Sequence, residues 1–85
     1  MKEEIQKFVI FCLESYKIDK QLSGAEALRD FEQYDVISYL EDGFEVLHTQ
    51  GREYIVADIN DYIHRKQNTK WFYTMEVHKL SINQN

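Results

Sequence analysis

Residues 34–63 read YDVISYLEDGFEVLHTQGREYIVADINDYI, and this stretch decides how the chain folds. Its first apolar residues recur at intervals of four, four and three, which places them on one face of a helix: Val36, Leu40, Phe44 and Leu47. Asp42-Gly43 is a turn signal inside this pattern. The pattern therefore indicates either one kinked helix or two short helices that break at Gly43.

The same stretch carries capping residues. Asp35 is placed to cap the helix that begins at Val36, and Gly51 is placed as a C-terminal cap. Further on, apolar residues at helical spacing predict another helix from about Asp58 to Gln67. Residues 53–57 include a short β-branched run that also suits a strand, so the start of this helix stays open.

Two helices are predicted before this stretch. Residues 2–18 form the first, and this helix is apolar on more than one side. It is expected either to lie centrally and pack on two faces or to meet another subunit. The second helix begins at Ser23, because Ser23-Gly24-Ala25-Glu26 is a capping box.

The end of the chain allows two interpretations. Residues 67–69 look like a linker, and residues 70–82 then alternate with the two-residue period of a strand. Trp71 and Met75, however, also fit one helical face. We therefore predict an all-α, compact bundle of four or five short helices over residues 1–67. Residues 68–85 are expected to be a docking segment or tail, which is either helix or strand.

Composition restricts the class of protein. The 85 residues carry a net charge of -5 and are 44% hydrophobic and 14% aromatic, which is typical of one soluble domain with a real core. An acidic field repels phosphate backbones and anionic lipids. The single cysteine, Cys12, indicates a reducing compartment. No apolar run approaches the roughly 20 residues of a membrane span, so we expect a cytoplasmic protein that binds no membrane.

The chain shows no constellation of residues typical of catalysis. Cys12, His48, His64 and His78 form no pair at zinc-ligand spacing, so we expect no metal and no cofactor. The serines lack a glycine-flanked elbow, and the carboxylates between residues 41 and 61 are best read as a solvated helical face. We therefore expect a protein that is not an enzyme.

Two groups of residues are candidates for interaction. His48, Arg52 and Tyr54 lie at a helix end and connection, where functional residues gather. The structural alternative is that Arg52 neutralises nearby acids, Tyr54 packs and His48 caps a helix. The second group combines basic and aromatic residues, as single-strand binders do: Arg65, Lys66, Trp71, Phe72 and Tyr73. Pairing of this group with the acidic residues 41–61, within or between chains, is the favoured interpretation.

Residues 5–63 resemble a family of small bacterial proteins described as a domain of unknown function. The resemblance is carried by DVI at 35–37, YL at 39–40, VLHT at 46–49, and YIV at 54–56 with DI at 58–59. The family implies no catalytic residues. It does imply a neighbouring partner, because its members are often encoded beside proteins resembling ADP-ribosyltransferases.

These observations favour a non-enzymatic protein-interaction module, such as the antitoxin-like or accessory member of a pair, which also forms a homodimer. One alternative is a nucleic-acid-binding regulator that uses residues 64–73, although the acidic charge makes nucleic acid a poor partner. The other alternative is a small-ligand or enzymatic domain around His48, Arg52 and Tyr54.

Overall fold

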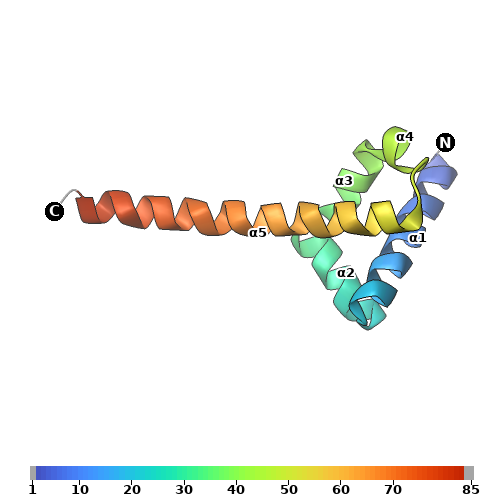
Figure 1. Cartoon of the computed structure of the whole chain (residues 1–85), viewed down its shortest axis with the longest axis horizontal. Helices are drawn as coiled ribbons and strands as arrows, with labels where there is room; N and C mark the ends of the chain where they lie inside the picture. Colours follow the sequence, from blue (N-terminus) through green and yellow to red (C-terminus); the bar gives the residue numbers. More distant parts are fainter. Residues whose placement is uncertain (1, 84–85) are drawn as a thin grey trace.

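The computed structural model describes the backbone of residues 2–83 and the side chains of residues 2–68. Its elements are α1 (Lys2–Lys20), α2 (Gly24–Gln33), α3 (Val36–Asp42), α4 (Phe44–Leu47) and α5 (Arg52–Asn83). Helices α1 to α4 gather around the first half of α5, and the second half of α5 extends beyond them (Figure 1). The predicted all-α class is confirmed: residues 2–83 contain helices and no strand.

The core takes one apolar face from each of the helices that meet around α5. Seven residues within it are less than 2% exposed: Cys12, Ala27, Phe31, Val36, Leu40, Ile55 and Ile59. The rings of Phe8 and Phe44 meet edge to face, with centroids 5.5 Å apart. Burial in this core raises the pKa of the Cys12 thiol to about 12, which makes it a packing residue and a poor nucleophile.

The connection from α1 to α2 follows its local sequence. Gln21 ends α1 in the left-handed conformation (φ 57°), and the Leu22 amide donates to the Lys17 carbonyl at 2.9 Å. Ser23 and Glu26 then form both bonds of a capping box, since the Glu26 amide donates to Ser23 Oγ at 3.1 Å and the Ser23 amide donates to Glu26 Oε1 at 2.9 Å. The boundary predicted at Ser23 is confirmed.

In the connection from α2 to α4, the predicted cap at Asp35 is wrong and the helix breaks at Gly43. Asp35 precedes α3 with φ 55°, and its side chain makes no capping hydrogen bond. An N-cap residue uses extended backbone to aim its side chain at the first turn, and left-handed backbone turns it away. Gly43 separates α3 from α4, so the residues form two short helices. A Cβ at Gly43 would lie 3.0 Å from Leu47 Cδ1, which shows how closely the chain turns there.

Helix α5 differs most from expectation. Residues 53–57 and 70–82 are helical, and the linker predicted at residues 67–69 is wrong because α5 runs through it. Gly51 was predicted to end the preceding helix, but its carbonyl accepts the Ile55 amide at 3.0 Å and so opens α5. Asn and Thr cost only a few tenths of a kcal/mol each in a helix interior, and no proline interrupts the pattern.

Candidate interaction surface

One side of the first half of α5 is hollowed in two places. The first hollow, of about 630 Å³, has Ser15, Ile18 and Asp19 of α1 and Glu53, Val56 and Asn60 of α5 in its lining. The second, of about 470 Å³, has Tyr16, Asp30, Tyr34, Asn60, His64 and Gln67 in its lining. Asn60 lines both hollows, so they adjoin. Together they form the α5 trough, which follows α5 from Gly51 to Gln67.

The first hollow combines an apolar floor with one buried polar atom that has no hydrogen-bond partner among the described residues. Val56 and Ser15 are buried, whereas Ile18 is 58% exposed at the rim. Asn60 Oδ1 is buried and accepts no hydrogen bond from any residue whose side chain the structure describes. A buried acceptor left without a donor costs about 1–3 kcal/mol. This atom therefore favours a donor brought by something that binds in the trough.

The second hollow is more polar. The Tyr16 hydroxyl donates to Asp30 Oδ2 at 2.6 Å, and the Gln67 amide donates to the Tyr34 hydroxyl at 3.0 Å. Burial, reinforced by the bond to Asp30, raises the pKa of Tyr16 above its ordinary value. The two hollows together hold four acids (Asp19, Asp30, Glu53 and Asp61) and two permanent cations (Lys20 and Arg52), so the trough carries a charge of -2.

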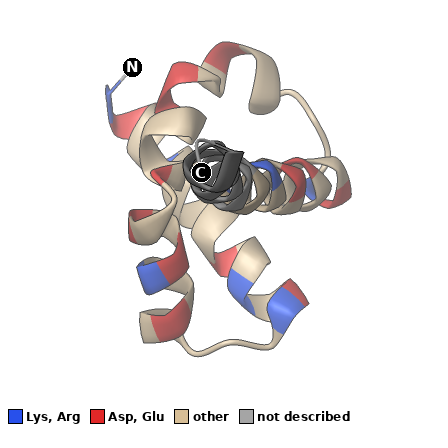
Figure 2. Cartoon of the chain, turned by 90° about the vertical axis from the view of Figure 1, so that its left-hand side faces the viewer, with Lys and Arg blue, Asp and Glu red and all other residues tan. Residues whose placement is uncertain are grey.

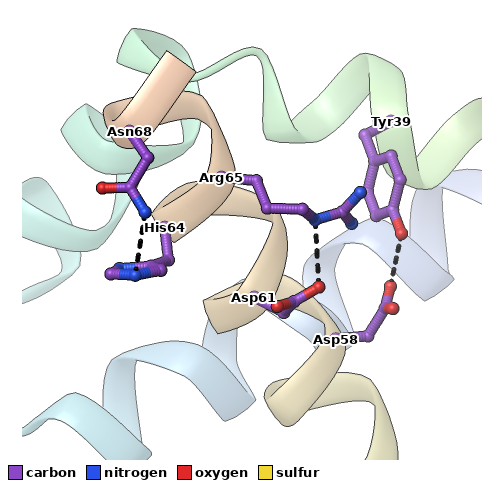
Figure 3. A network of polar contacts seen from close by, with 6 residues as sticks. All are labelled: Tyr39, Asp58, Asp61, His64, Arg65 and Asn68. Atoms are coloured by element: carbon purple, nitrogen blue, oxygen red, sulfur yellow. Dashed lines mark hydrogen bonds and ion pairs between the residues drawn. The ribbon is translucent and has the colours of Figure 1, made fainter. Parts of the chain in front are cut away.

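A second set of polar contacts joins α3 to α5 (Figure 3). The Tyr39 hydroxyl donates to Asp58 Oδ2 at 2.6 Å, and the Tyr39 ring stacks on Tyr62 with centroids 3.9 Å apart. Burial and the bond to Asp58 raise the pKa of Tyr39 to about 12. One turn further along α5, Arg65 pairs with Asp61 at 3.0 Å. The two Tyr39 contacts hold the first half of α5 against α3, whereas the Arg65–Asp61 pair lies within α5.

The structure separates the first group of predicted site residues. The His48 ring stacks on Phe44 with centroids 4.3 Å apart, and its Nδ1 lies 2.6 Å from the Phe44 carbonyl oxygen. His48 thus packs at the end of α4, which agrees with the alternative interpretation that His48 caps a helix. Arg52 lines the first hollow, while Tyr54 is 56% exposed and lines neither hollow. His48, Arg52 and Tyr54 do not line a common cavity.

The second predicted group is described in part. Arg65 is engaged by Asp61, and Lys66 Nζ lies 5.5 Å from the centroid of the Tyr62 ring. Trp71, Phe72 and Tyr73 belong to α5, but their side chains lie outside the described residues. Acidic residues occur on every helix of the bundle (Figure 2).

Across residues 2–68, His, Cys, Asp and Glu side chains nowhere gather in threes that could hold a metal ion. Over the same part of the chain, no helix combines the length and apolar character needed to cross a bilayer.

Sequence reasoning missed the α5 trough. Ser15 and Asn60 are ordinary polar residues in the sequence, and the expected linker at residues 67–69 hid the continuity of α5. The available signal was α1, whose apolar residues lie on more than one side. Ile18 is one of these outer residues, and it forms part of the trough.

Comparison with known proteins identifies the family and no activity. The model of a family described as "Protein of unknown function (DUF3791)" matches residues 7–66. The resemblance noted over residues 5–63 is thereby confirmed, and the whole second half of α5 lies outside the match. No curated protein and no solved structure matches the chain.

Proposed function

We propose that this chain, which belongs to the DUF3791 family of proteins of unknown function, is a protein-interaction module and not an enzyme. The observation that carries the proposal is the solvent-facing side of α1. Large apolar side chains remain exposed there although the core beneath them is closed: Ile10 at 60%, Phe11 at 45% and Ile18 at 58%. A helix whose outer side is also apolar is suited to bury that side against another protein.

The energetics favour a partner on this side of α1. Moving one exposed large apolar side chain into a fully buried contact stabilises a complex by about 1.5–3 kcal/mol. Ile10 and Phe11 are consecutive and face solvent together, and Lys7 and Glu14 lie on the same exposed side. Two apolar anchors among charged residues match the usual composition of an interface, with an apolar centre and a polar rim.

The partner we propose is an ADP-ribosyltransferase-like protein encoded next to this chain. The resemblance of residues 5–63 suggests that neighbour, and the net charge of -5 suits a basic surface on it. In this proposal the chain restrains or escorts its neighbour in the cytoplasm, where a free, buried thiol such as Cys12 stays reduced.

The proposed module is also a homodimer. Half of α5 extends beyond the helices that could cover it (Figure 1). Most helical stability in proteins comes from packing of the helix against other elements and not from intrinsic propensity. A second copy would supply that packing.

Affinity purification of the tagged full-length chain, co-expressed with its genomic neighbour, tests the hetero-partner. The wild type should recover the neighbour in stoichiometric amount, and the double substitution Ile10→Lys, Phe11→Lys should lose it. The matched control is Gln33→Lys with Gln50→Lys, which adds the same two charges at exposed residues outside α1. This control should keep the neighbour, because it leaves Ile10 and Phe11 unchanged.

Two outcomes would contradict the proposal. One is recovery of the wild-type chain without the neighbour. The other is equal recovery of the neighbour by the wild type and by the Lys double variant, when circular dichroism shows that both proteins are folded. Recovery of nucleic acid in place of protein would favour the regulator that uses residues 64–73.

A further inference from the structure

We propose that the α5 trough of one copy is the docking site for the second half of α5 from a second copy. This inference rests on the proposed homodimer and specifies its interface. Each chain would place residues 68–83 in the trough of the other, so that two α5 helices run antiparallel about a two-fold axis. Such an interface is isologous, and both troughs are filled at once.

The two parts of α5 have matching lengths. The part that lines the trough, residues 52–67, and the part that extends beyond it, residues 68–83, contain 16 residues each. At 1.5 Å per residue, each part is about 24 Å long. One extended half of α5 therefore spans one trough from end to end.

The geometry of α5 directs this half to another molecule. The helix is continuous from Arg52 to Asn83, and its second half leads away from the bundle (Figure 1). A continuous helix cannot lay its second half along its first half. The trough of the same chain is thus out of reach of residues 68–83, whereas the trough of an antiparallel copy lies alongside them.

The sequence of α5 fits this pairing. Ala57, Asn60 and His64 lie on the trough side of α5, and Trp71 and Met75 follow His64 after seven and eleven residues. These intervals are those of one helical face. In an antiparallel pair that sets residues 68–83 of one copy along residues 67–52 of the other, Trp71 would lie opposite His64 in the second hollow. Met75 would lie opposite Asn60, one turn from the apolar Val56.

Charge and hydrogen bonding also favour the pairing. The trough carries -2, and residues 68–83 carry +1 from Lys70 and Lys79 against Glu76. The Trp71 indole is a donor, and Asn60 Oδ1 is a buried acceptor without a donor among the described residues. A second copy would therefore cover apolar surface, oppose unlike charges and supply a donor.

Trp71 is the only tryptophan in the chain, so its fluorescence reports the docking directly. We would follow Trp71 emission and light-scattering mass of the full-length protein over a dilution series. The expected result is a dimer whose Trp71 emission lies at shorter wavelength and moves to longer wavelength as dilution separates the copies. Ala57→Arg, which adds a long charged side chain inside the trough, should raise the dimer dissociation constant at least about tenfold.

The matched control is Ile10→Arg, on the outer side of α1 and away from the trough. It should leave the dissociation constant unchanged, although it should weaken binding of the proposed neighbour. Both sites are exposed and helical, and Arg is a good helix former, so both variants should fold.

The inference is overturned if the wild-type chain stays monomeric at high concentration. It is also overturned if a dimer forms with Trp71 emission independent of dilution, or if Ala57→Arg dimerises as well as the wild type. A monomeric chain that still recovers its neighbour would leave the hetero-partner proposal standing and refute this one alone.

Discussion

Tyr39 links two helices through a single side chain. Its hydroxyl donates to Asp58 and its ring stacks on Tyr62, so both contacts reach from α3 to α5. Burial, reinforced by the bond to the Asp58 carboxylate, explains why the pKa of Tyr39 is raised in the folded chain. The Tyr39–Asp58 contact could not be predicted from the sequence, because 19 residues separate the two positions.

Tyr39→Phe should lower the free energy of unfolding by about 1 kcal/mol at neutral pH, because the ring stays and one hydrogen bond is lost. The folded pKa of Tyr39 is raised from 10 to about 12, so its contribution is complete below pH 10. It is lost as pH rises from 10 towards 12, because the unfolded tyrosine ionises first.

Urea unfolding followed by circular dichroism at several pH values measures this. The gap between wild type and Tyr39→Phe should narrow above pH 10, and Tyr54→Phe is the control because Tyr54 is 56% exposed. A gap that stays constant from neutral pH to pH 12 would refute the role assigned to the Tyr39 hydroxyl.

At the scale of helices, the sequence predicted boundaries where local chemistry decides them. The capping box at Ser23 and the break at Gly43 both occur where expected. The sequence misled where distant packing decides. Residues 53–57 also suit a strand, which left the start of this helix open in the sequence, and the structure makes them part of α5 with Ile55 buried in the core. Asp35 has a capping residue's identity, but the turn from α2 to α3 holds it in a left-handed conformation.

The end of α1 provides a test at this scale. Gln21 occupies the left-handed region at φ 57°, where a side chain costs about 1–2 kcal/mol and glycine costs little. Gln21→Gly should therefore leave stability unchanged or raise it by up to about 1 kcal/mol. Lys20→Gly, one residue earlier and inside α1, should lower stability by about 0.5–1 kcal/mol.

Thermal unfolding of the two glycine variants and of the wild type measures these differences in stability. If both variants are destabilised to the same extent, the left-handed end of α1 is not an independent feature of the fold.

The whole molecule combines a closed core with two surfaces suited to other proteins. The outer side of α1 exposes Ile10 and Phe11, and the α5 trough lies along a helix whose second half leaves the bundle. The interaction class stays a prediction, which rests on acidic charge, small size and the lack of a catalytic constellation in the sequence. The trough could not be predicted from the sequence, because it requires α1 and α5 to pack together with Ser15 and Asn60 lining one hollow.

Native mass spectrometry of the full-length chain, purified together with its genomic neighbour, measures both proposed interactions at once. We expect a complex that contains two copies of the 10.3-kDa chain and the neighbouring protein. A single 10.3-kDa chain without any bound protein, at the concentration of the native cell, would contradict it.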